Sequence, residues 1–146
     1  MAFKELSRTE VDGLLSEERV VRIGFEANGE RYLVPLGFVP HGGALYAMTT
    51  HGRKTRMAAV NPKVSFQIDT SARTGPFSWH SVSGEGLFEI VTDAKEIDAI
   101  SPLLISRFPD MPDWMQAEYA RKQERGEVVF VRLRPGQMTG RKSEPA

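Results

Sequence analysis

Apolar and polar positions alternate with a period of about two along much of this chain, a pattern typical of half-buried β-strands. The first such segment, residues 20–25, is followed by Asn28-Gly29, a strong hairpin signal, so residues 32–39 are expected to return as the partner strand. Pro35 has no N–H to donate, which predicts that this strand lies at a sheet edge, at a bulge or against a ligand. Gly37 would let another group approach the backbone closely.

Four further segments have strand patterns, and Gly84 and Gly86 predict a bend or bulge in the longest of them. These strands are expected at residues 44–50, 63–69, 78–91 and 128–133. Because the strands follow one another with short turns and glycine bends, the pattern predicts about six antiparallel strands in a closed or partly closed barrel. The chain is therefore expected to be mainly β with peripheral helices, and a single domain over residues 1–146.

Helical patterns lie between and before these strands. Ser7 and Glu10 form a capping-box sequence that predicts the start of a first helix. Residues 93–107 have apolar positions at helical spacing, and Pro102 is expected to kink or divide that helix. A further helix is expected to end near Glu124. The polar segment 136–146 is predicted to be a flexible tail, either frayed or docked on a partner.

The most concentrated chemistry lies in residues 49–62, where a strand ending in Thr49 and Thr50 is followed by Gly52, Arg53 and Lys54 and then by a short helical pattern. Unpaired N–H groups and the positive end of a helix attract anions, so this arrangement suits a phosphate group. The alternative is a solvated helix start with ordinary surface cations. Local composition favours the second interpretation.

Charge and composition exclude several classes of partner and site. The chain has 19 basic and 19 acidic residues, so no global field favours nucleic acid or an anionic membrane, and neither is expected as a partner. It contains no cysteine, which excludes disulfides, thiolate metal sites and cysteine nucleophiles. The first residues do not resemble a signal peptide and no apolar run is long enough to span a membrane, so a cytoplasmic location is expected.

Other candidate sites have weaker patterns. His41, His51 and His80 lie in separate segments without the spacing of metal ligands, so no metal site is expected. No Gly-x-Ser-x-Gly elbow of a hydrolase is present. His80 could donate to an oxyanion, although a single histidine beside an aromatic residue such as Trp79 is more often structural.

Several motifs in this order resemble one known family. They are Val34-Pro35-Leu36-Gly37-Phe38, Gly42-Gly43, Gly52-Arg53-Lys54, Asn61-Pro62-Lys63-Val64-Ser65-Phe66 and Trp79-His80-Ser81-Val82. Together the motifs resemble the FMN-binding split-barrel proteins related to pyridoxamine 5'-phosphate oxidase, in the branch that includes nitroimidazole-resistance-type reductases. The resemblance covers roughly residues 6–135 and implies a six-stranded antiparallel split barrel.

The resemblance also implies a site. Arg53 and Lys54 would bind the FMN phosphate, with Thr49 and Thr50 along the phosphate and ribityl chain. The backbone of the segment Val34, Pro35, Leu36 and Gly37 would face the isoalloxazine ring. His80 and Ser81 would contact the flavin from the other subunit or at the ring edge, because such proteins are homodimers with flavin at the interface.

The functional expectation is an FMN-dependent oxidoreductase acting on a small organic molecule, with NAD(P)H as a possible electron donor. Relatives in the superfamily bind F420 or haem, so those cofactors stay open, as does a non-catalytic protein for storage or sensing. The end of the chain departs from true pyridoxamine phosphate oxidases. Their Arg-Leu-x-Pro motif is followed by a substrate-binding Arg and Trp, whereas Arg132-Leu133-Arg134-Pro135 continues here as Gly136-Gln137-Met138. This difference argues against vitamin B6 oxidation.

Overall fold

The structure is a computed structural model and describes residues 3–144. Eight strands lie in this part of the chain: β1 (Phe3–Glu5), β2 (Val20–Ala27), β3 (Glu30–Gly37), β4 (Val39–His41), β5 (Ala44–Thr50), β6 (Lys63–Asp69), β7 (Trp79–Val91) and β8 (Val128–Ser143). Its five helices are α1 (Arg8–Glu17), α2 (Arg53–Val60), α3 (Ser71–Thr74), α4 (Ala94–Arg107) and α5 (Asp113–Glu124).

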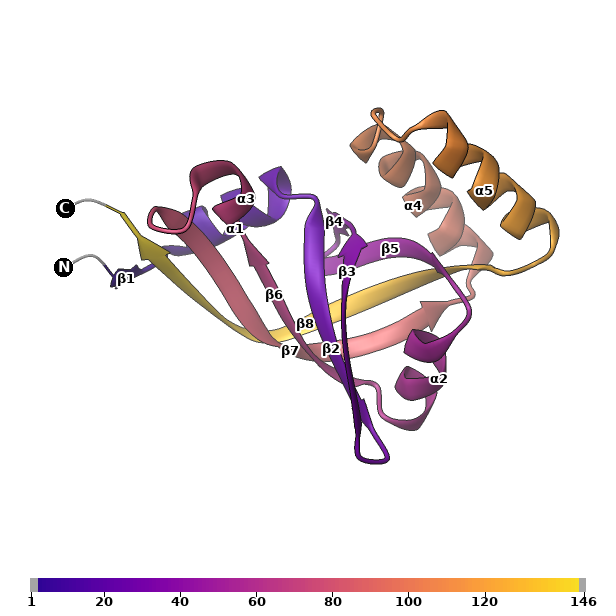
Figure 1. The fold of residues 1–146 in the computed structure, drawn as a ribbon, viewed down its shortest axis with the longest axis horizontal. Helices are drawn as coiled ribbons and strands as arrows, with labels where there is room; N and C mark the ends of the chain where they lie inside the picture. Colours follow the sequence, from indigo (N-terminus) through magenta and orange to yellow (C-terminus); the bar gives the residue numbers. More distant parts are fainter. Residues whose placement is uncertain (1–2, 145–146) are drawn as a thin grey trace.

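The strands form one antiparallel sheet in the order β3-β2-β6-β7-β8-β5-β4, with β1 paired to the far end of β8 (Figure 1). Cα atoms of β3 and β5 come within 8 Å of each other without forming a ladder, so the sheet curls into a barrel that stays split there. The predicted fold class, an antiparallel split barrel with peripheral helices, is confirmed. The strand count is eight rather than six, because β1 and β4 are too short for alternation to show.

The β2–β3 hairpin forms where the sequence predicts it. Asn28 and Gly29 have φ angles of 52° and 80°, as a type I′ turn requires at both central positions. Ala27 and Glu30 face each other on either side of the turn. Pro35 lies on β3, which pairs only with β2 and is therefore an edge strand. The edge position expected from Pro35 is confirmed.

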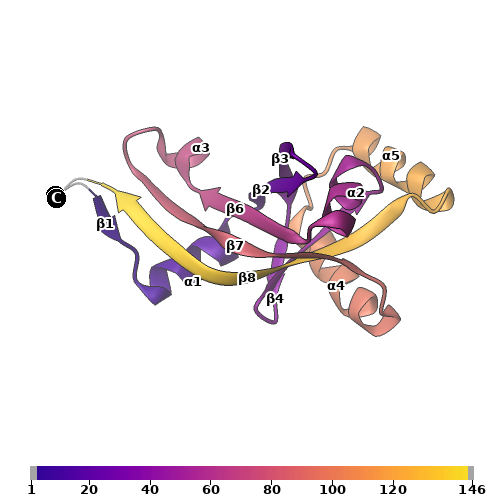
Figure 2. The same cartoon turned by 90° about the horizontal axis from the view of Figure 1, so that it is seen from below.

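The main core lies inside the barrel. Burial alternates along β2, so that every second residue points inward, and the ring of Phe25 meets that of Phe88 edge-on at 5.0 Å. A second apolar cluster lies between α4 and the outer face of β4 and β5, with Ile100 and Leu104 facing Tyr46. Helices α4 and α5 therefore flank one end of the sheet, whereas α1 and α3 flank the other end (Figures 1 and 2).

The bend expected in the longest strand is present. The register of β7 with β8 shifts between Gly84 and Gly86. A Cβ atom at Gly86 would lie 2.5 Å from the carbonyl oxygen of Arg134, so no larger residue fits without moving β8.

Two of the predicted helices differ in how closely the structure matches their expected details. The capping box is confirmed, since Ser7 Oγ accepts from the Glu10 N–H at 3.1 Å and Glu10 Oε1 accepts from the Ser7 N–H at 3.0 Å. The other helix is not divided at Pro102, because α4 runs from Ala94 to Arg107. Its apolar face packs on both sides of the proline, and this packing holds the helix together.

The prediction of a flexible tail over residues 136–146 is wrong for its described part. β8 continues to Ser143, pairing with β7 on one side and β1 on the other. Its backbone pairs with β7 along the segment and with β1 at residues 141–143, although the side chains are mostly polar. A polar strand of this kind has no alternation to reveal it. Gly140 is packed closely against Leu6 of the N-terminal segment. Residues 145 and 146 lie outside the described part.

A partly buried ion pair connects this last strand to α1. Lys142 Nζ lies 2.8 Å from Glu10 Oε2. Its hydrogen bond, followed by that of the Ser7 backbone, lowers the pKa of Glu10 from 4.5 to about 2. Because the pKa is lower in the folded state, the contribution of Glu10 to stability is complete above pH 4.5 and is lost as the pH falls towards 2.

We expect Glu10→Gln to lower the midpoint of thermal unfolding by a few degrees at pH 7, and by progressively less as the pH falls below 4.5. Thermal scans over this pH range test the prediction. Glu17→Gln is the matched control, because Glu17 lies on the same helix and forms no ion pair within residues 3–144. A Glu10 effect independent of pH would contradict the assignment.

Candidate functional site

The predicted anion cradle lies where β5 passes into α2. Gly52 is the N-cap residue, and Thr55 Oγ1 both accepts from its N–H and donates to its carbonyl oxygen, each at 3.0 Å. This contact closes the first turn, while the first N–H groups of any helix lack acceptors inside it. Thr49 is buried on the barrel side of β5, and Thr50 points to the opposite side. The two hydroxyl groups therefore face different sides of the sheet.

Arg53 extends from the first turn of α2 towards the β2–β3 hairpin. Its guanidinium carbon lies 4.4 Å from the ring centroid of Tyr32, and its Nη2 atom lies 3.4 Å from Glu30 Oε2. Both partners belong to β3, so the fold brings the candidate cradle beside the edge strand that was expected to face the flavin ring.

Lys54 has different surroundings. Burial and then the positive charge of Lys122 on α5 lower the pKa of Lys54. The end of α5 is held beside α2 by a hydrogen bond from the His51 N–H to the Glu127 carbonyl oxygen at 3.1 Å. Within residues 3–144 Lys54 forms no ion pair with a carboxylate. A bound anion would therefore relieve the repulsion between two lysines.

The residues of β3 alternate between the core and the outside. Val34 and Leu36 are half-buried and pack against the main core, whereas Pro35 and Gly37 are exposed. Gly37 does allow a close approach, since a Cβ atom there would lie 2.9 Å from Cζ of Phe108. The ring that lies against Gly37 within this chain is thus that of Phe108, in the loop after α4. The free backbone edge of β3 faces the split.

His80 and Ser81 lie at the other end of the barrel. Ser81 is opposite Asp69 at the end of β6, whereas α2 connects to the start of β6 at Lys63. Six residue steps at ~3.3 Å each place the two ends of β6 about 20 Å apart. One chain therefore brings Thr49, Arg53, Lys54 and β3 together but leaves His80 and Ser81 away from them.

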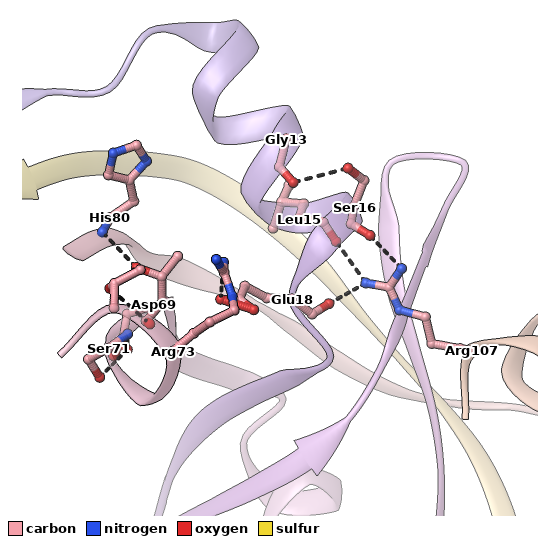
Figure 3. Close-up of polar contacts among 11 residues, drawn as sticks. Gly13, Leu15, Ser16, Glu18, Asp69, Ser71, Arg73, His80 and Arg107 are labelled. Carbon is pink, nitrogen blue, oxygen red and sulfur yellow. Dashed lines mark hydrogen bonds and ion pairs between the residues drawn. The ribbon is translucent and has the colours of Figure 1, made fainter. Parts of the chain in front are cut away.

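The surroundings of His80 are polar (Figure 3). Its backbone N–H donates to Thr70 Oγ1 at 3.0 Å, and its Nε2 atom lies 3.3 Å from Glu144 Oε2. In the same turn Asp69 accepts from the N–H and the hydroxyl group of Ser71 at 2.7 and 2.5 Å. Burial raises the pKa of Asp69, but the hydrogen bonds from Ser71 and Gln67 and the charge of Arg22 outweigh this effect, so the net shift is downward.

Figure 3 also shows how the loop after α4 is anchored. The guanidinium group of Arg107 donates to the carbonyl oxygens of Leu15, Ser16 and Glu18, at the end of α1. Burial and then the nearby Arg19 lower the pKa of Arg107. Because a cation is favourable at a helix C-terminus, Arg107 holds α4 to α1 and fixes Phe108 against Gly37.

Three residues around the cradle were not found from the sequence: Glu30, Tyr32 and Lys122. Their contacts connect segments that are distant in the chain, such as 30 and 53. The only local signal is that the Asn-Gly turn places Glu30 and Tyr32 on one face of a strand.

Beside Tyr32, a pocket of about 520 Å³ opens on the outer face of the barrel, with Gly24 and Ser65 among the residues that line it.

The fold and this arrangement define a split-barrel protein. The profile of the family described as pyridoxamine 5'-phosphate oxidase matches residues 7–142, so the chain belongs to that family.

Solved structures support this assignment. An FAD-binding protein from Mesorhizobium loti is 27% identical with a TM-score of 0.79, covering 98% of each chain. An FAD-binding protein from Mycobacterium smegmatis is 23% identical with a TM-score of 0.68, covering 97% of this chain and 100% of the other. A Bacteroides thetaiotaomicron structure, described as a candidate 5-nitroimidazole antibiotic resistance protein, is 16% identical with a TM-score of 0.69. The match covers 99% of this chain and 93% of the other. At these lower identities the second and third show the fold alone.

One curated relative matches only in part. An uncharacterized protein of Rhizobium meliloti (strain 1021) is 29% identical over 89 residues, which are 61% of this chain and 58% of the relative. The chain thus spans little more than half the length of this relative. Among the helices of residues 3–144, none is long and apolar enough to cross a membrane.

Proposed function

We propose that this protein is an FMN-dependent oxidoreductase in which Arg53 and Lys54 bind the flavin phosphate. The observation that carries the proposal is the position of both cations in the first turn of α2, beside the open edge of β3, in a chain of this family. Charge-assisted hydrogen bonds and the helix end both favour a phosphate monoester at that point. The backbone of residues 34–37 would then face the ring.

The flavin would supply the redox chemistry, namely the transfer of electrons between a small organic molecule and a donor such as NAD(P)H. The contribution of the chain is to bind the phosphate, orient the ring along β3 and limit access of water. Among the residues placed at the cradle, none has to act as an acid or base.

Vitamin B6 is not the substrate that we propose. Arg132, in the Arg-Leu-x-Pro motif, donates to both carboxylate oxygens of Glu96 at 2.6 Å and to Glu89 at 3.2 Å. The hydroxyl group of Tyr46 also donates to Glu96, at 2.6 Å. Arg132 is therefore committed to a network that fastens α4 to β5, β7 and β8. The substrate-binding Arg and Trp that follow this motif in true pyridoxamine phosphate oxidases do not follow it here, where the chain continues as Gly136-Gln137-Met138.

The test is the cofactor of the purified protein. We expect a flavin absorption spectrum, and FMN in amounts stoichiometric with the chain when the cofactor is released by heat and identified by mass. Because two similar structures are of FAD-binding proteins, FAD is the second compound to quantify. Recovery of FAD, F420 or haem instead would contradict the FMN assignment.

Turnover separates an enzyme from a binding protein. We expect NADH or NADPH to reduce the bound flavin, and an electron acceptor to reoxidise it in steady state. A bound flavin that neither nucleotide reduces would favour a non-catalytic protein for storage or sensing.

We further propose that the protein is a homodimer with one flavin site formed from both subunits at each end of the interface. The distance between the cradle and His80 within one chain supports this arrangement, since a second chain would supply His80 and Ser81. The outer face of the β2–β3 hairpin supports it too, because the apolar side chains of Val20 and Leu33 are 42% and 70% exposed there.

A further inference from the structure

The cradle contains an acidic residue of its own. Glu30 Oε2 lies 3.4 Å from Nη2 of Arg53, in the position of an anion bound to that guanidinium group. The Tyr32 ring lies beneath the same group, 4.4 Å from the guanidinium carbon, and Tyr32 in turn packs near Phe25 of the core. Because Glu30 and Tyr32 are two residues apart on β3, both side chains lie on the same side of the strand.

These two contacts have opposite consequences for a ligand. The stacked ring of Tyr32 holds the guanidinium group in one place while leaving its N–H groups free to donate. Glu30 occupies one of those N–H groups and adds a negative charge beside any incoming phosphate. The side chains of Arg53 and Glu30 are 46% and 63% exposed, so water screens the pair and a phosphate with two negative charges can displace the carboxylate.

Lys54 shows that this arrangement is specific to Arg53. No carboxylate is paired with Lys54 within residues 3–144, and its neighbouring charge is the cation of Lys122. One cation of the cradle is thus already compensated from within the chain, and the other is not. Binding of a phosphate must exchange an internal contact at Arg53 but only adds a contact at Lys54.

We propose that Glu30 is an internal competitor that lowers the affinity of the cradle for a phosphate group, and that Tyr32 is the positioning residue that keeps Arg53 aligned for it. The proposal rests on the proposed function, because it concerns how the same cradle binds a phosphomonoester. Glu30 returns to Arg53 when the phosphate leaves, so the contact stabilises the phosphate-free form of the cradle.

The experiment compares FMN and riboflavin affinities, measured by fluorescence titration of the protein after its cofactor is removed. Glu30→Gln should tighten FMN binding by about twofold to fivefold, the range for an exposed ion pair, and should not change riboflavin binding. Glu26→Gln is the matched control, because Glu26 is on the same hairpin, loses the same charge and has no contact with Arg53.

The Tyr32 variants must act in the opposite direction. Tyr32→Leu keeps an apolar side chain against Phe25 but removes the aromatic face, and should weaken FMN binding by about fivefold with riboflavin unchanged. Tyr32→Phe keeps the face and should bind as the wild type does. Unfolding midpoints of all variants separate these effects from a loss of fold.

Three outcomes would overturn the proposal: unchanged or weaker FMN binding in Glu30→Gln, an equal gain in Glu26→Gln, or an equal change for riboflavin. Failure of the proposed function looks different. The wild type would then bind neither flavin, whereas titration of inorganic phosphate, followed by the NMR signal of the Arg53 side chain, would still report whether Glu30→Gln strengthens the cradle. No response of that signal in either protein would reject the competition as well.

Discussion

Replacing both Arg53 and Lys54 with alanine should lower the affinity for FMN by about tenfold or more. Hydrogen bonds to charged groups contribute ~1.5–3 kcal/mol each, and every ~1.4 kcal/mol changes a dissociation constant tenfold. Arg53 is half-exposed and already in contact with Glu30, so part of its contribution is offset. Lys54 lacks such a partner in the described chain, and we therefore expect Lys54→Ala alone to have the larger single effect.

Fluorescence titration of the cofactor-free protein with FMN and riboflavin measures this loss. Riboflavin lacks the phosphate, so its affinity should be the same in the wild type and the double variant. Arg8→Ala combined with Lys95→Ala is a matched control, because it removes two surface cations from α1 and α4 while leaving the cradle intact. Normal retention of FMN by the Arg53 and Lys54 variant would remove the basis of the phosphate assignment.

Local signals were sufficient for much of the fold. Asn28-Gly29 determines a turn through its own backbone angles, and Ser7 with Glu10 determines a helix start through contacts three residues apart. The end of β8 could not be found in this way. Its residues after Gly136 form a strand because β7 and β1 lie on either side, and no property of the segment alone shows that neighbours are present.

In the candidate site, too, local features could be predicted from the sequence and contacts between distant residues could not. Residues 49–62 could be singled out because hydroxyl groups, a glycine and three cations are concentrated in one short stretch. The partners of its cations could not, since Glu30 is 23 residues from Arg53 in the chain and reaches it only because the barrel curls β3 towards α2. Lys122 lies near Lys54 because the end of α5 returns beside α2, where the Glu127 carbonyl oxygen accepts from the His51 N–H. The sequence thus singled out the candidate stretch but not the residues that lie around it.

Mixed dimers made from two variants with weakened FMN binding should recover high-affinity FMN sites that neither variant has alone. In one variant Arg53 and Lys54 are alanine, and in the other His80 and Ser81 are alanine. If each site combines the cradle of one subunit with His80 and Ser81 of its partner, a mixed dimer has one site with every side chain intact and one site with both sets missing. We therefore expect up to half of the wild-type number of high-affinity FMN sites.

The same mixture distinguishes the shared site from a site within one chain. If His80 and Ser81 served the cradle of their own chain, each site of a mixed dimer would lack one set, and mixing would restore nothing. The variants are unfolded and refolded together, native mass spectrometry verifies that mixed dimers have formed, and FMN titration counts the intact sites. Since Ser81 Oγ accepts a hydrogen bond from Gln67 at 3.1 Å and His80 contacts Glu144, unfolding midpoints show whether the second variant keeps its fold. Recovery in mixed dimers, with both parents folded and deficient, would require that two chains build each flavin site.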